Sequence, residues 1–186
     1  MIRLRNLGIL IATAGTLALV SVGPAFAATT TVTATVSAGG FTLTSPATAS
    51  VASTLDGTNQ APTYTADLAA NDQRGSGAGW NLTITSTQFT SGAPVHTLST
   101  SASSLTGVTA VCAGPGTCTN PTNSITYPVA VPAGAGPPAA VKFYNAAVDT
   151  GMGDFTITPT IAVSIPANSY VGTYTSTVTW AIVTGP

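Results

Sequence analysis

The chain has 186 residues, of which 44% are hydrophobic and only 5% are charged, with four Lys or Arg against five acidic residues. So few cations cannot supply the several phosphate contacts of a nucleic-acid-binding surface, or a basic patch for anionic lipid, so both are disfavoured as partners. Disorder is also disfavoured, because it usually combines high charge with low hydrophobicity.

The N-terminus has the features of an export signal. Arg3 and Arg5 supply positive charge, residues 7–22 form an apolar run, and residues 25–27 form a small-x-small cleavage site. This pattern predicts a signal peptide over residues 1–27. The alternative is an uncleaved membrane anchor, but the run is short for a bilayer span and contains polar residues.

We therefore expect a secreted chain of residues 28–186 with no membrane span after cleavage. This length suits one domain with one core. Only Arg74 and Lys142 remain as cations in it, and it contains no Glu.

The body of the chain predicts many short strands, because Val, Ile, Thr and Tyr dominate while Gly, Pro, Ser and Asn recur at short intervals. No segment has a convincing helical period. This number of strands implies two packed sheets or a barrel, and we predict an all-β fold, an antiparallel β-sandwich in a single domain with long loops. The predicted strands cover residues 30–36, 41–44, 47–53, 63–69, 79–89, 105–111, 125–129, 141–145, 154–165 and 172–183.

The clearest alternation lies in residues 154–165, where apolar residues alternate with Asp, Thr, Ala and Ser. Such a strand covers a core on one face and meets water on the other. Pro159 interrupts the pattern, because proline cannot donate a hydrogen bond to a ladder, and it predicts an edge or a bulge there. Residues 113–123 and 132–138 are rich in Gly and Pro and predict long surface connections.

Cys112 and Cys118 bracket a five-residue turn and are the only cysteines. In an oxidising compartment they predict one disulfide that closes a short loop and contributes about 2 kcal/mol. A metal site would need more ligands than two thiols, and His96 is the only histidine. We therefore expect no metal and no cofactor.

Two segments about a hundred residues apart share a tryptophan-x-aliphatic triplet. Trp80 and Leu82 lie in the first, Trp180 and Ile182 lie in the second, and both belong to Thr-rich runs with period two. In a strand this period sends the Trp and the aliphatic residue of each triplet to the same face.

Residues 72–82, the Thr-rich strand that follows them, and residues 170–182 resemble the WxL family of bacterial cell-surface proteins. The resemblance spans roughly residues 39–186. The first triplet matches at Trp80 and Leu82; the second matches at Trp180 but only approximately at Ile182, where the family usually has Leu. That difference conserves volume and apolarity.

The resemblance implies a β-rich secreted protein attached non-covalently to the Gram-positive cell wall. Its implied partner is peptidoglycan or another wall polymer, often alongside other cell-surface proteins. The ligand-binding candidates are Trp80, Leu82, Trp180, Ile182, Arg74 and Asp72.

Each candidate also has a structural interpretation. A Trp that alternates with Val, Ile and Tyr is more often a core residue, whereas an exposed indole could stack on a sugar ring. Asp72 and Arg74 form either a loop-fixing ion pair or, through Arg74, a receptor for a muropeptide carboxylate. Asp149 and Asp154 could form a loop cation site, although turn formation is the commoner role of such residues.

The sequence indicates a non-enzymatic protein, because one His, no Glu and five scattered Asp form no recognisable catalytic motif. An alternative function is a structural subunit of a surface fibre or layer assembled by edge-strand pairing, with residues 30–36 as the added strand. Thr-x-Thr runs also suggest ice binding, but they lack a fixed repeat length.

Overall fold

The structure is a computed structural model that describes residues 28–114 and 116–186. The chain divides at residue 35 into two units. Residues 28–35 are exposed and belong to no strand, while residues 36–186 form the body. No helix occurs in the described ranges, so none of them contributes a helix that could cross a membrane. The signal-peptide prediction concerns residues 1–27, which lie outside the described part.

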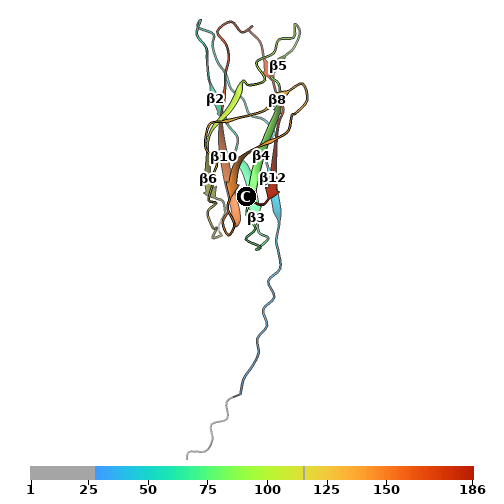
Figure 1. Ribbon diagram of the computed structural model, residues 1–186, viewed down its shortest axis with the longest axis vertical. Helices are drawn as coiled ribbons and strands as arrows, with labels where there is room; N and C mark the ends of the chain where they lie inside the picture. The colour runs from blue at the N-terminus through green and yellow to red at the C-terminus, as the bar shows by residue number, and fades with distance from the viewer. Residues whose placement is uncertain (1–27, 115) are drawn as a thin grey trace, which may run out of the picture. The chain divides into compact units, whose positions relative to one another are not determined.

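The first sheet is antiparallel and is centred on β10, as Figure 1 shows. Its order is β1-β3-β10-β6-β7, with β2 also paired to β10 beyond the end of β3. The strands are β1 (Phe41–Thr44), β2 (Thr63–Thr65), β3 (Leu68–Asp72), β6 (Ser103–Cys112), β7 (Val129–Ala130) and β10 (Gly153–Val163).

The second sheet is centred on β4 (Trp80–Thr87), which pairs antiparallel with β12 (Val178–Thr184) on one side. On the other side it pairs antiparallel with β9 (Val141–Ala146) and parallel with the short β8 (Ala133–Gly134). A separate two-stranded ribbon joins β5 (Thr90–Ser91) to β11 (Tyr174–Thr175). The two main sheets pack against each other, which confirms the predicted all-β antiparallel sandwich.

The core forms because period-two alternation sends one side of each strand inward. In β10 every second residue from Phe155 to Val163 is buried, and the residues between them are more exposed. β4 is buried on both faces along most of its length. The Thr85 hydroxyl on its outer face donates to the Pro138 carbonyl at 2.9 Å, so the 132–140 connection covers this part of the sheet.

Pro159 lies in a central strand, so the predicted edge position is wrong, while the predicted bulge lies next to it. A register shift between β10 and β6 occurs at Thr160 and Ile161. On the other side, β3 pairs with β10 only as far as Ile157, and β2 begins its pairing at Thr160. Pro159 therefore occupies the gap between two partner strands, where its missing N–H removes no ladder bond.

Several predicted strands differ from the observed ones. Residues 30–36 and 47–53 have strand composition but belong to no strand, because composition alone supplies no pairing partner. Of residues 125–129 only Val129 is in a strand. The predicted strands 63–69 and 172–183 are each divided, the first into β2 and β3 and the second into β11 and β12.

Candidate functional site

The two tryptophan triplets lie on neighbouring antiparallel strands. The first is at the start of β4 and the second is in β12, and Leu82 is the direct partner of Ile182. Because opposed residues point to the same face, Trp80 and Trp180 both belong to the inward side of the second sheet. The resemblance of the triplets therefore reflects a shared place in one sheet.

Trp80 is a core residue. Its side chain is 1% exposed. Its indole N–H donates to the Gly151 carbonyl at 2.8 Å. Its ring packs at centroid distances of 6.0 Å from Tyr144 and 6.4 Å from Phe155. Leu82 is fully buried beside it. This arrangement leaves neither Trp80 nor Leu82 a face for a ligand and fits the core interpretation.

Gly151 makes this packing around Trp80 possible. Its φ is 71°, in the left-handed region that favours glycine. A Cβ there would lie 2.7 Å from the indole nitrogen of Trp80 and would also collide with the side chain of Ala146. The loop between β9 and β10 can therefore close over the indole only with glycine at this position.

Trp180 is only half-buried, because β12 is an edge strand. Its ring meets the fully buried Phe143 edge-on, with the centroids 5.4 Å apart. Ile182 is also half-buried and packs against the core. The second triplet therefore keeps part of its surface accessible, in contrast to the first.

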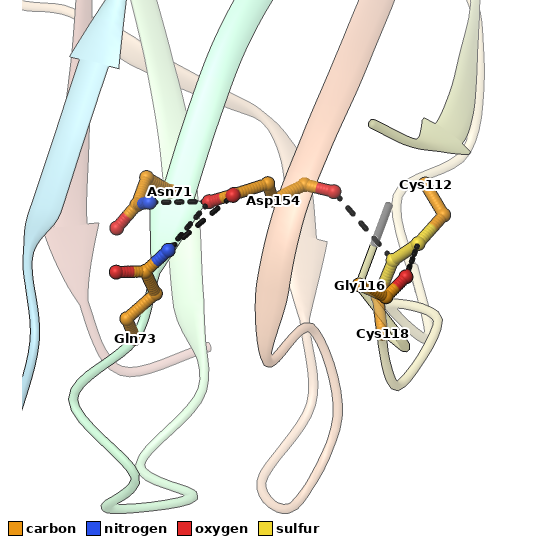
Figure 2. The surroundings of a disulfide bond; sticks show 6 residues. All are labelled: Asn71, Gln73, Cys112, Gly116, Cys118 and Asp154. Carbon is orange, nitrogen blue, oxygen red and sulfur yellow. Dashed lines mark hydrogen bonds between the residues drawn. A yellow bond between two sulfur atoms is a disulfide. The ribbon is translucent and has the colours of Figure 1, made fainter. Parts of the chain in front are cut away.

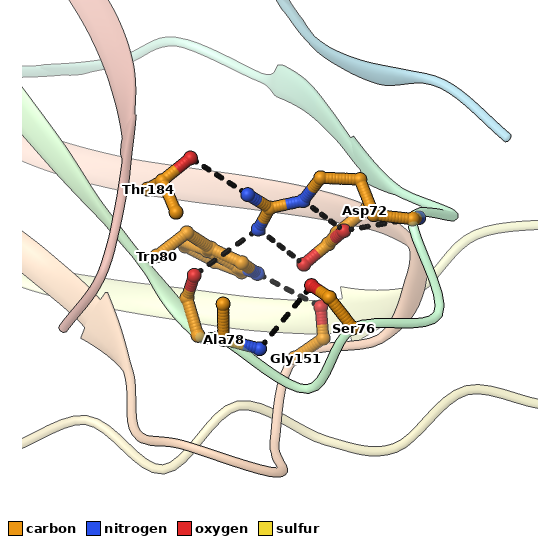
Figure 3. Close-up of polar contacts among 8 residues, drawn as sticks. Asp72, Ser76, Ala78, Trp80, Gly151 and Thr184 are labelled. Carbon is orange, nitrogen blue, oxygen red and sulfur yellow. Dashed lines mark hydrogen bonds and ion pairs between the residues drawn. The ribbon is translucent and has the colours of Figure 1, made fainter. Parts of the chain in front are cut away.

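Arg74 connects the two sheets through several hydrogen bonds, which Figure 3 shows. Its Nε donates to Asp72 Oδ1 at 2.8 Å, and Nη2 donates to Asp72 Oδ2 at 2.9 Å and to the Gly79 carbonyl at 3.1 Å. Nη1 donates to the Thr184 hydroxyl at 2.7 Å. The guanidinium also lies over the Phe41 ring at 3.6 Å. The end of β3 in the first sheet is thereby tied to the start of β4 and the end of β12, which lie side by side.

Asp72 is 3% exposed and is held as a carboxylate by this contact. The hydrogen bond from the Arg74 side chain lowers the pKa of the Asp72 carboxyl below its ordinary value of 3.8. Asp72 accepts from Nε and Nη2, while Thr184 and the Gly79 carbonyl accept from Nη1 and Nη2. Both bidentate edges of the guanidinium are therefore engaged within the protein, which leaves neither for a muropeptide carboxylate. The geometry fits the loop-fixing interpretation.

A groove opens beside Trp180, between the irregular segment 45–55 and residues 169–180. It consists of two adjoining hollows of about 460 and 560 Å³. Both are lined by Val51, Phe89 and Tyr174. The first hollow also contains Tyr64, Val178 and Trp180, together with serine and threonine residues of both segments.

Within residues 28–114 and 116–186, no charged side chain lines either hollow. The lining combines hydroxyl groups, which can donate and accept hydrogen bonds, with aromatic rings, which offer flat apolar surfaces. This chemistry suits an uncharged, hydroxyl-rich polymer such as a glycan, and it offers no cationic partner to a phosphate or a carboxylate.

Sequence reasoning did not identify this groove. The segment 47–53 was predicted as a strand, and Tyr64, Phe89 and Tyr174 were not singled out. The sequence feature that could have indicated the groove is the Ser, Thr and Ala composition of residues 45–54. Small side chains leave space beside this segment, and Val51 is its one large aliphatic residue.

Cys112 and Cys118 form a disulfide at the end of β6, shown in Figure 2. Beside it, Asp154 accepts hydrogen bonds from the side-chain amides of Asn71 and Gln73. These contacts join β3 to β10 at one end of the first sheet. Among the described residues, no group of three His, Cys, Asp or Glu side chains could hold a metal ion.

His96 stacks on Tyr170 next to the groove, with ring centroids 3.8 Å apart and planes at 8°. Tyr170 lines the second hollow and is 65% exposed. The histidine therefore extends the aromatic surface at this end of the groove.

The model of the family described as "WxL domain surface cell wall-binding" matches residues 14–186. Neither the curated proteins nor the solved structures gave a match to this chain.

Proposed function

Because this chain belongs to the WxL family of surface cell-wall-binding domains, we propose that it is a secreted, non-catalytic protein that attaches non-covalently to peptidoglycan. The observation that carries this proposal is the uncharged groove of hydroxyls and aromatic rings beside Trp180. A glycan strand offers hydroxyl and acetamido groups to the Ser and Thr side chains and apolar ring faces to the aromatic ones.

Within this function the six candidate residues have two kinds of role. Trp180 contacts the wall polymer, and the half-buried Ile182 supports it from the same strand. The buried residues Trp80 and Leu82 hold β4 in the core. Asp72 and Arg74 fix the ends of the triplet strands and do not touch the ligand.

The composition of the groove supports binding without catalysis. Among the described residues, neither hollow is lined by Asp, His, Lys or Cys, the usual acids, bases and nucleophiles, and the neighbouring His96 is stacked on Tyr170. The binding partner is then retained on the groove without chemical change.

Export is part of the same proposal. Cleavage after residue 27 places the protein outside the cell, in the thick wall of a Gram-positive organism. N-terminal sequencing of protein recovered from the medium or the wall should begin at Ala28, and retention of residues 1–27 on the recovered protein would contradict this part.

A pull-down with purified wall sacculi tests the function. The protein should sediment with the sacculi, whereas an unrelated secreted β-domain should not. Ala49 is exposed and lies on the side of the groove formed by segment 45–55. Ala49→Arg places a long charged side chain there and should reduce retention of the protein on sacculi at least about tenfold. Ala139→Arg, at an exposed site outside the groove, is the matched control and should leave retention unchanged.

Both variants should keep the circular dichroism spectrum and unfolding midpoint of the unaltered protein, because both sites are exposed. Retention no better than that of the unrelated domain would overturn wall binding. Equal retention of Ala49→Arg and Ala139→Arg would overturn the groove as its site. A soluble glycan fragment that competes better than a free stem peptide would support the glycan strand as the part recognised.

A further inference from the structure

The arm segment, residues 29–37, has the sequence of a strand but pairs with none of the residues that the structure describes. Its Thr and Val residues alternate, with Val32, Ala34 and Val36 on one face and threonines on the other. Val32 is 86% exposed and Val36 is 95% exposed, and the segment belongs to no strand. It contains no charge and no proline to discourage pairing.

β12 offers an unpaired edge to such a segment. Its seven residues pair with β4 without any register shift, and in the described part of the chain no strand pairs with its other side. It carries no charged residue and no proline. Charged residues and proline usually protect an edge strand from pairing with another chain, so β12 lacks both of these protections.

The outer edge of β9, on the opposite side of the same sheet, is protected. The Asn145 N–H donates to the side-chain oxygen of Asn123 at 3.1 Å, and the Tyr127 hydroxyl donates to the Phe143 carbonyl at 2.9 Å. The 119–127 connection thus covers β9. Among the described residues β1 packs near β12, but no backbone hydrogen bond reaches the outer side of that strand.

The side chains of β12 also suit an added strand. Val178, Trp180 and Ile182 are half-buried on its inward face, and they would lose solvent exposure beside the Val and Ala face of the arm segment. The outward face carries Thr179 and Ala181, which would continue the threonine face of the arm segment.

A second unpaired edge exists in β6, but it is less regular. Beyond Leu105 this strand has no partner on its outer side in the described ranges. Its ladder with β10 shifts register at Thr160 and Ile161, and Gly107 lies at that irregularity. A regular added strand therefore fits β12 better than β6.

We propose that the arm segment of one copy adds to the β12 edge of a second copy, so that the protein self-associates by β-strand addition. The arm segment and the edge are different surfaces, so the contact is heterologous and can be repeated from copy to copy. The partner is then another molecule of this chain. Val178 and Trp180 also line the first hollow, so the arm segment and a wall glycan would meet the same stretch of β12.

The test is the mass of the full-length exported protein measured by analytical ultracentrifugation over a range of concentrations. The unaltered protein should form oligomers whose share rises with concentration. Thr33→Pro, which removes a donor from the arm segment, should raise the dissociation constant at least about tenfold without changing the unfolding midpoint. A peptide of residues 29–37 in excess should dissociate the oligomers.

Matched threonines distinguish the two edges. Thr179→Lys on β12 should weaken association, whereas Thr109→Lys on the exposed face of β6 should not. A monomer at every concentration would overturn the proposal, and so would oligomers that Thr33→Pro leaves intact. Loss of association in Thr109→Lys but not in Thr179→Lys would assign the contact to β6 and also overturn it. Thr33→Pro should still sediment with sacculi, so failure of this proposal is distinguishable from failure of wall binding.

Discussion

At the scale of single residues, the two tryptophans of the repeated triplet have different environments because their strands have different places in the sheet. Trp80 belongs to a central strand and is enclosed, whereas Trp180 belongs to an edge strand and is half-exposed. The same local sequence therefore supports stability at one site and leaves a partly exposed indole at the other, which we propose contacts the wall.

Replacing each tryptophan should reveal this difference. Trp80→Ala should lower the free energy of unfolding by about 3–5 kcal/mol, because it leaves a large cavity and an unpaired Gly151 carbonyl. Trp180→Ala should cost about 1–2 kcal/mol, because less area is buried. Urea unfolding followed by circular dichroism measures both. An equal loss in the two variants would contradict the distinction between core and edge.

Gly151 gives a second prediction at this scale. Gly151→Ala should cost about 2–4 kcal/mol, because it adds a steric collision with Trp80 and Ala146 to the cost of the left-handed conformation. Gly57→Ala is the control, since Gly57 has a φ of 86° and nothing within 4 Å of the added Cβ. It should lose only about 1 kcal/mol. Similar losses in thermal unfolding would argue against tight packing at Gly151.

The sequence predicts the existence of the site better than the role of each residue. The triplets, the strands that carry them and the Asp72–Arg74 pair were all identifiable. The burial of Trp80 was not, because it depends on β12 and β9 flanking β4, and these pairings join residues far apart in the chain.

At the scale of elements, alternation identified strands that have partners and also segments that have none. Residues 154–165 were predicted well, because a long apolar stripe fixes the face that a strand buries. Residues 30–36 and 47–53 have similar composition but were predicted wrongly. A strand forms only where an adjacent strand takes up its backbone hydrogen bonds. The alternation within a segment does not indicate whether such an adjacent strand exists.

The Arg74 contacts, which tie β3 to β12, should be worth more than an ordinary surface ion pair. Arg74→Met should lower the free energy of unfolding by about 3 kcal/mol, because it leaves the buried Asp72 carboxylate without its partner. Lys142→Met removes the exposed cation of the body and should change stability by less than about 0.5 kcal/mol. Chemical denaturation at neutral pH compares the two variants.

Acidification should remove the stabilisation that the contact between Asp72 and Arg74 provides. Since the pKa of Asp72 is lowered in the folded state, its stabilising effect is complete above the ordinary value of 3.8 and is lost as the pH falls below it. The difference in unfolding free energy between the unaltered protein and Arg74→Met should therefore shrink on acidification. A difference that stays constant down to pH about 2 would show that Asp72 is not the group responsible.

At the scale of the whole molecule, we propose that the groove, and not the overall charge, determines the kind of ligand. An uncharged site should bind the wall with little dependence on salt. Raising the ionic strength from about 0.05 to about 0.5 M should change the affinity for sacculi less than about twofold, because screening acts only on charges. A steep loss of binding in the same sedimentation assay would indicate an anionic wall polymer instead of a neutral glycan.

The position of β4 at the centre of its sheet also has a consequence for how the protein is made. All of its strand partners, β8, β9 and β12, come later in the chain. A polypeptide that leaves a narrow translocation channel N-terminus first cannot complete this sheet until residue 184 has emerged. Such distant pairing also makes folding slow, in the range of milliseconds to seconds. In the export that we propose, the same topology that encloses Trp80 therefore keeps this sheet unformed until its last strand has left the channel.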